Sequence, residues 1–278
     1  MKRSIFVLTL TLILVFTPVF SGAETARPDA ESVSVPIIMY HSLLPQKTNE
    51  WNISPDAFAH DLRYLSENGY TTVFLSDLIA YVCQGVPLPE KPIVLTFDDG
   101  YYNNYSRGLP LLEEYNMKMV LAVIGTSSDH WTEHADEIDE RYGHLTWPQI
   151  AEMSASGLVE LANHTHNLHK NENGRKGCRK KEGEDPTAFA QMLTEDIEAL
   201  QSRIEAASGE RPLSFVYPFG AKCSHAEEVL RGMGFKVTLS CASGLNYLRV
   251  GDEDALFDMK RNNRTPDTTL AQILKKIA

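Results

Sequence analysis

The most constraining feature of this sequence is a regular alternation between short apolar runs and amphipathic segments. The runs "PIVLTFD" (92–98) and "MVLAVIG" (119–125) are apolar almost throughout, and each follows a segment with helical spacing. Strands of this kind, separated by helices, are typical of a parallel sheet covered on both faces. Seven or eight such units predict an α/β fold, a distorted barrel of seven or eight parallel strands. A doubly wound open sheet is the alternative.

Helix-start and helix-stop signals place the remaining elements. Ser54 is a typical N-cap, Pro55 suits the first helical position, and Gly69 ends the pattern. The expected helices lie near 55–68, 76–84, 105–115, 146–157, 186–207 and 224–234, with a terminal helix from about 267. The other expected strands are 35–41, 71–75, 159–164, 213–220, 236–241 and 256–262.

The N-terminal segment differs from the rest. Lys2 and Arg3 precede a long apolar run that ends at small residues, so we interpret 1–23 as a signal peptide. An uncleaved membrane anchor is the alternative, and association with the membrane or cell wall is compatible with either. We expect a flexible leader at 24–34, a catalytic domain at 35–278, and a secreted or cell-envelope location.

The net charge bears on the expected binding partners, and the cysteine content bears on disulfide pairing. Without Lys2 and Arg3 the chain has 24 basic and 37 acidic residues, a net charge near −13, which excludes nucleic acid as an expected partner. Four cysteines allow three pairings. We expect a bridge between Cys223 and Cys241, because both follow neighbouring strands at one face of the barrel and export permits oxidation.

Polar and reactive side chains gather where the expected strands end. Barrel enzymes carry their chemistry at this carboxyl face. The residues concerned are His41, Asp98, Asp99, His164, Pro218, Phe219 and Arg261. A functional site is therefore expected at this face.

Two motifs indicate metal chemistry. In "TFDDG", one of the adjacent carboxylates Asp98 and Asp99 can ligate a metal while the other accepts a proton, although capping of the next helix is an alternative. The run "HTHNLH" adds His164, His166 and His169. One carboxylate and two imidazoles make the three-ligand site with open positions that catalytic zinc uses. The pair His164 and His166 is one option, since alternate residues of a strand share a face.

Together, "TFDDG", the downstream "HT" with a second histidine, and "FVYPFG" resemble the polysaccharide deacetylases, the NodB-like carbohydrate esterases of family four, over about 35–265. The resemblance implies that Asp98 is the general base and that Asp99 and His164 ligate a divalent ion, with zinc expected. The second family histidine usually lies four residues after the first, where this chain has Leu168. His169 lies five residues on, as in the branch resembling exported poly-N-acetylglucosamine deacetylases, and is therefore the third expected ligand.

The resemblance has two departures. Val216 stands where the family often has an arginine that contacts the base, and Arg261 is the expected substitute, with a solvated arginine as the alternative. A late histidine in an I-x-L-x-H strand is also missing, but "IIMYH" ends in His41. Because the first and last strands of a barrel are neighbours, a circularly permuted strand would bring His41 to the same place as general acid. A buried structural histidine is the alternative.

These motifs predict an enzyme that removes N-acetyl groups from an N-acetylglucosamine-containing polysaccharide and releases acetate. The resemblance implies that Tyr217, Pro218 and Phe219 contact the substrate, with the Phe219 backbone N–H facing the oxyanion. A non-catalytic carbohydrate-binding protein or an O-deacetylase is the alternative. A protein that only binds sugar would not need the intact base and all three ligands.

Overall fold

A computed structural model describes residues 32–47 and 49–278. The predicted signal peptide and most of the predicted leader lie outside this part of the chain. The first strand, β1 (Val33–Val35), includes two residues of the predicted leader. None of the helices in the described residues is both long and apolar enough to cross a bilayer.

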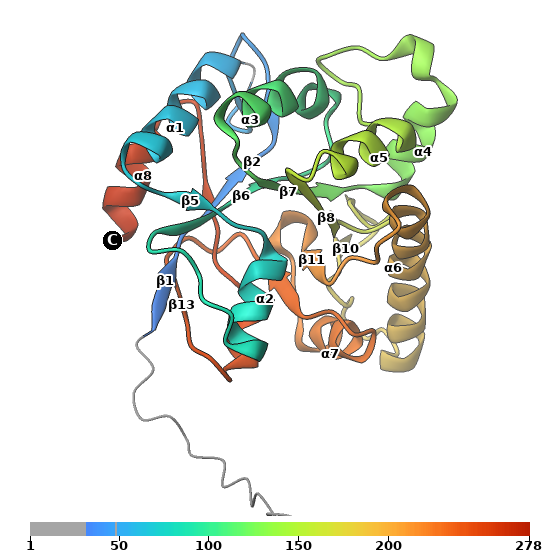
Figure 1. Cartoon of the computed structure of the whole chain (residues 1–278). Coiled ribbons are helices and arrows are strands. Elements are labelled where there is room, and N and C mark those ends of the chain that lie inside the picture. Colours follow the sequence, from blue (N-terminus) through green and yellow to red (C-terminus); the bar gives the residue numbers. More distant parts are fainter. Residues whose placement is uncertain (1–31, 48) are drawn as a thin grey trace, which may run out of the picture. The chain divides into compact units, whose positions relative to one another are not determined.

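A parallel sheet forms the centre of the domain (Figure 1). Its strands follow the order β12 (Val237–Leu239), β11 (Ser214–Val216), β8 (Val159–Asn163), β7 (Met119–Val123), β6 (Pro92–Phe97), β2 (Ile37–Tyr40) and β14 (Asn262–Asn263). A further strand, β5 (Thr71–Thr72), also pairs with β6. From β12 to β2 the order never reverses, as a curled barrel requires and a doubly wound sheet does not. The predicted distorted barrel is confirmed.

One short segment connects the two ends of this sheet. Met259 forms a parallel bridge with Leu239 of β12, and three residues later β14 pairs with β2 on the opposite edge. The last strand, predicted near 256–262, is therefore shorter and lies later in the chain, at Asn262–Asn263. A 3₁₀ turn, η4 (Glu253–Leu256), precedes the crossing segment. This segment passes from one edge of the sheet to the other and therefore cannot form a long strand along either edge.

Eight α-helices occur in the described residues, and all but one were predicted. The exception is α4, whose sequence "GTSSDHWTE" has no apolar stripe. The helices are α1 (Pro55–Glu67), α2 (Leu75–Gln84), α3 (Leu109–Tyr115), α4 (Gly125–Glu133), α5 (Trp147–Ala155), α6 (Pro186–Ser208), α7 (Ser224–Gly232) and α8 (Leu270–Ile277). Ser54 caps α1 as expected, accepting a hydrogen bond from the Ala57 N–H.

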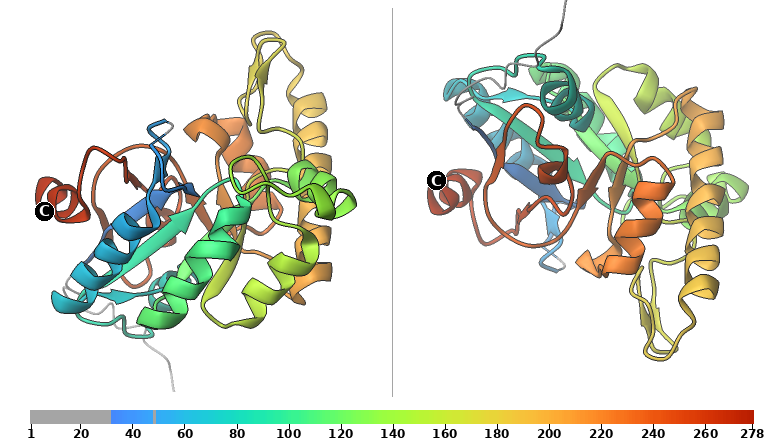
Figure 2. Two further views of the ribbon diagram at one scale, coloured as in Figure 1. Left: turned by 90° about the horizontal axis from the view of Figure 1, so that it is seen from above. Right: turned by 90° about the horizontal axis from the view of Figure 1, so that it is seen from below.

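Short elements complete the chain. Two of them form the hairpin of β9 (Asn171–Glu172) and β10 (Arg175–Lys176), which extends from the body of the domain (Figure 2). The other short strands are β3 (Ser42–Leu43), β4 (Asn52–Ile53) and β13 (Asn246–Leu248), which pairs antiparallel with β1. The remaining helical turns are η1 (Asn104–Gly108), η2 (Ala135–Glu137) and η3 (Pro218–Gly220).

Alternation along the strands decides which side chains reach the site. On β6, Leu95 and Phe97 pack outward against helices that include α1 and α3, whereas Val94 packs with α2 in a second cluster inside the curl. Thr96 shares the parity of Val94, and the next position of that parity is Asp98. The strand pattern therefore directs Asp98 into the barrel.

A buried ion pair fixes the segment that follows β14. The Arg264 guanidinium contacts Asp61 of α1 at 2.7 Å (Nε–Oδ2), and the Tyr40 hydroxyl donates to the same carboxylate. All three side chains are buried. The contact thus ties the end of the chain to α1 and β2.

We predict that Arg264→Met lowers the free energy of unfolding by roughly 3–5 kcal/mol, because it leaves the Asp61 charge buried without its partner. Urea unfolding followed by circular dichroism measures this change. Lys47→Ala is the control, since Lys47 and Asp267 form an ion pair with side chains 56% and 73% exposed. Its cost should stay below about 1 kcal/mol. Equal losses in the two variants would contradict the prediction.

Candidate active site

Asp98 and Asp99 follow β6 and both line one cavity of about 730 Å³. Simple alternation would turn Asp99 to the outer face. Instead Asp99 has a φ of 72°, in the left-handed region that aspartate adopts more readily than most residues. This backbone conformation brings two adjacent carboxylates into the same cavity.

Arg261 holds Asp98 through two parallel contacts, from Nη1 to Oδ1 at 2.6 Å and from Nη2 to Oδ2 at 2.8 Å. Its Nε donates to the Ser240 carbonyl at 2.9 Å, and both members of the pair are buried. Burial alone would raise the pKa of Asp98, but the charges of Arg261, His164 and His41 and the Arg261 hydrogen bonds together outweigh it, and the pKa lies below its usual value. Asp98 is therefore an ionised proton acceptor. The structure brings Arg261 to the carboxylate that the sequence predicted.

Asp99, His164 and His169 form a cluster whose ligand atoms all lie within 4.8 Å of one another. Asp99 Oδ1 is 3.5 Å from His164 Nε2 and 3.4 Å from His169 Nε2. Tetrahedral ligands at about 2.1 Å from a zinc ion would be separated by roughly 3.4 Å. Among the described residues this buried oxygen has no hydrogen-bond partner. The three side chains therefore fit a divalent ion.

The orientation of the His164 ring and the protonation state of the His169 ring both suit metal binding. His164 Nδ1 donates to the Val216 carbonyl at 2.7 Å, which leaves Nε2 facing the cluster. Burial lowers the pKa of His169 to about 4, so its ring is neutral at physiological pH. A neutral imidazole is the form that binds metals.

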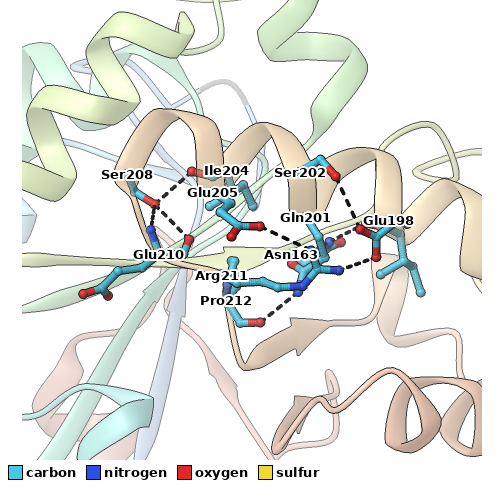
Figure 3. A network of polar contacts seen from close by, with 11 residues as sticks. Asn163, Glu198, Gln201, Ser202, Ile204, Glu205, Ser208, Glu210, Arg211 and Pro212 are labelled. Atoms are coloured by element: carbon cyan, nitrogen blue, oxygen red, sulfur yellow. Dashed lines mark hydrogen bonds and ion pairs between the residues drawn. The ribbon is translucent and has the colours of Figure 1, made fainter.

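A buried amide network positions the turn that carries His164. Asn163, the last residue of β8, donates to the Ile197 carbonyl and to Gln201, and Gln201 donates to the Pro212 carbonyl (Figure 3). The Asn163 side-chain oxygen accepts from the Thr165 N–H at 2.9 Å. Thr165 has a φ of 72°, which is strained for a β-branched residue. Helix α6 thus holds the strained turn in place.

His166 points away from the cluster. Its Nε2 lies 3.9 Å from Asp129, and its backbone N–H donates to Asp196. The alternative ligand pair of His164 and His166 is therefore wrong. The positive φ at Thr165 interrupts the strand alternation on which that alternative relied.

His41 lines the same cavity as Asp98, at the end of β2. Strand β2 pairs with β14, so the strand that carries His41 does lie beside the last strand of the sheet, as a permuted strand would. Its ring packs against Trp51 with centroids 4.8 Å apart, and its buried Nδ1 has no partner in the described part of the chain. Its role as general acid stays a prediction.

The three residues predicted to contact substrate divide into two groups. Phe219 lines the cavity, is 40% exposed, and has its ring centroid 4.4 Å from that of His169. Tyr217 is 1% exposed and packs on Phe215 between α6 and α7, and Pro218 is also buried. The alternation along β11 turns Tyr217 outward, and neither Tyr217 nor Pro218 is among the residues that line the cavity, so their contact with substrate stays a prediction.

Sequence reasoning missed most of the cavity rim. These residues lie on loops without periodicity, so no strand or helix pattern indicates where they point. For Tyr101 a signal was available, because this residue directly follows "DDG". Its ring stacks on His144. The missed lining residues include Trp51, Tyr101, Arg141, Tyr142 and His144.

All four cysteines lie within the described residues, and each is a free thiol. The structure therefore does not contain the predicted Cys223–Cys241 bridge, and the surroundings of the two sulfurs contradict it. Cys241 lines the cavity with its Sγ 3.8 Å from Arg261, whereas Cys223 packs with the α6–α7 cluster. The two residues follow strands at the same end of the barrel but face different compartments.

Comparison with known proteins agrees with this geometry. A family model described as polysaccharide deacetylase matches residues 85–238. The chain belongs to the polysaccharide deacetylase family. It is 29% identical over 227 residues to the poly-beta-1,6-N-acetyl-D-glucosamine N-deacetylase of Escherichia coli strain K12. That match covers 75% of this chain and 34% of the relative, so the chain spans about a third of the length of this relative.

Two solved structures have the same fold. A de-N-acetylase from Aggregatibacter actinomycetemcomitans superposes with a TM-score of 0.74 at 25% identity, covering 88% of this chain and 100% of that chain. IcaB from Ammonifex degensii superposes with a TM-score of 0.70 at 28% identity, covering 84% and 93%. The curled parallel sheet is thus the fold of this deacetylase family.

We predict that His169→Ala lowers zinc affinity by more than roughly 100-fold, because a ligand is lost. Mutating a residue that only hydrogen-bonds to a metal ligand already lowers metal affinity by about 10–100-fold. His166→Ala should retain the metal. Equilibrium dialysis against zinc, followed by elemental analysis, measures both. Retention in the first variant together with loss in the second would overturn the ligand assignment.

Proposed function

We propose that this chain is an exported, metal-dependent hydrolase that removes N-acetyl groups from an N-acetylglucosamine polymer. One observation carries the proposal: an ionised, arginine-held carboxylate adjoins a carboxylate–imidazole cluster in a single cavity. Membership of the deacetylase family and similarity to proteins named N-deacetylases support it. Export rests on the N-terminal sequence, which lies outside the described residues.

The metal site would be formed by Asp99, His164 and His169, with zinc as the proposed ion. A divalent ion bound there would lower the pKa of water and polarise the acetyl carbonyl. The donor set of one oxygen and two nitrogens suits zinc.

Asp98 would act as the general base. A carboxylate has about four lone-pair positions, and Arg261 uses two of them, so Asp98 can still accept a proton from the attacking water. Arg261 acts on the reaction through Asp98: it keeps the carboxylate ionised and fixes its orientation.

His41 would donate a proton to the amine as the C–N bond breaks. The pKa of His41 lies below its usual value, because burial outweighs the Asp98 and Asp99 carboxylates, which favour the protonated ring. Trp51 holds the ring from one side. Asp98 and His41 would thus divide the two proton transfers between them.

The rim of the cavity supports a sugar polymer as substrate. Trp51, Tyr142 and Phe219 line it and are 42%, 73% and 40% exposed. Exposed aromatic rings gathered around one cavity mark a binding site, and their flat apolar faces suit the C–H faces of sugar rings.

Acetate release from defined polymers tests the proposal. The panel contains poly-β-1,6-N-acetylglucosamine, chitin oligomers, peptidoglycan and an O-acetylated xylan. We expect release from an N-acetylated polymer and its loss after chelation, with recovery on adding zinc. Release from the xylan alone would instead support an O-deacetylase, and no release from any polymer would contradict a catalytic role.

We predict that Asp98→Asn retains zinc but lowers the rate of acetate release by roughly 10²–10⁴-fold, because no base then receives the proton of water. Steady-state acetate assays and elemental analysis of one preparation measure the two quantities together. Near-parental turnover in a metal-loaded variant would refute the role of Asp98.

We predict that His41→Gln folds, keeps its metal and loses roughly 10²-fold or more in turnover, as expected for removal of a general acid. His130→Ala is the matched control, because His130 lies on α4 and is not among the residues lining the cavity. If the two variants deacetylate at similar rates, His41 is a structural histidine.

A further inference from the structure

Two cysteines that the deacetylation chemistry does not use lie together beside the site. Cys178 follows the β9–β10 hairpin and is fully buried, and Cys223 is the residue before α7. The Cys223 thiol points at the Cys178 backbone carbonyl, with 3.8 Å between Sγ and O. Both side chains belong to the cluster formed by α6, α7 and β11.

The segments that carry these cysteines adjoin two residues that line the catalytic cavity, His169 and Phe219. The hairpin directly follows His169, and Cys223 lies four residues after Phe219. They already touch, because a Cβ added to Gly177 would lie 2.8 Å from the Pro218 carbonyl oxygen. The Lys176 ammonium also lies 5.7 Å from the centre of the Phe219 ring. A covalent bond here would fix the metal-binding loop against the Phe219 turn.

Among the described residues, few contacts hold the hairpin to the body of the domain, and one of them places the Arg175 guanidinium 5.7 Å from the centre of the Phe189 ring of α6. Arg175 and Lys180 bind within the same loop, to Glu184. The hairpin extends from the body of the domain (Figure 2), and its strand pairing comprises two residue pairs. Such a short hairpin is marginally stable without support.

We propose that Cys178 and Cys223 form a disulfide that braces the β9–β10 hairpin against the Phe219 turn. The oxidant is a small-molecule disulfide such as oxidised glutathione. Cys223, the more accessible thiol, attacks it as the thiolate and releases one glutathione thiolate. Cys178 then attacks the mixed disulfide at the Cys223 sulfur and releases the second. The two thiol protons go to the departing thiolates, so the products are the protein disulfide and two reduced glutathione molecules.

Order of attack follows from accessibility. Cys178 is sealed in the apolar cluster, and burial raises the pKa of its thiol well above the usual value. It is therefore suited to resolving a nearby mixed disulfide and not to capturing an oxidant from solvent. Cys83 and Cys241 are both exposed, and Cys241 faces the catalytic cavity.

The test uses the full chain carrying Cys83→Ser and Cys241→Ser, which leaves only the proposed pair. The folded protein is exposed to oxidised glutathione, and thiols are counted after denaturation. We expect a fall from two thiols to none and a peptide that joins Cys178 to Cys223 in a non-reducing map. Two remaining thiols, or glutathione attached to Cys223 without the joined peptide, would overturn the proposal.

The rate of limited trypsin digestion in the hairpin tests the proposed disulfide brace without an activity assay. The hairpin and its exit carry Lys176, Arg179, Lys180 and Lys181 as cleavage sites. Oxidation should slow cleavage there roughly tenfold, because local opening precedes proteolysis. The same oxidation of a chain that also carries Cys223→Ser should have no such effect. Equal protection in both chains would contradict the brace, whichever polymer the enzyme deacetylates.

Discussion

The buried contact between Asp98 and Arg261 is the interaction on which the rest of the site depends. It joins the end of β6, at the middle of the sheet, to the segment that crosses between the two sheet edges. Two charges out of water are stable only with well-formed hydrogen bonds, and Ser240 and Thr96 complete those of Arg261. The same contact closes the barrel and sets the charge of the proposed base.

Much of this arrangement could be predicted because it follows from strand periodicity. The apolar runs gave the parallel sheet, and the parity of β6 sends Asp98 inward with Val94 and Thr96. The neighbourhood of first and last strands was enough to place His41 and Arg261 near Asp98. Residues at strand ends are predictable because their position depends on a repeating pattern and on how the sheet closes.

Other features of the site could not be derived from that pattern, because the backbone departs from it. Positive φ values at Asp99, Thr165 and Phe219 turn side chains against the alternation, and tertiary packing sustains them. The aromatic rim lies on loops, whose conformation depends on contacts distant in sequence. The pairing of cysteines failed for a related reason: knowing that Cys223 and Cys241 follow neighbouring strands does not reveal which compartment each sulfur faces.

The crossing segment also has a consequence for how the protein matures. The partners Asp98 and Arg261 are 163 positions apart, and contacts between β14 and β2 span 225. Such long-range contacts form late and slowly in folding, because the loop-closure entropy must be overcome before they contribute. A nascent chain therefore carries its ligand histidines before it has a barrel to hold them. The proposed base Asp98 thus gains its Arg261 partner only after almost the whole chain has been synthesised.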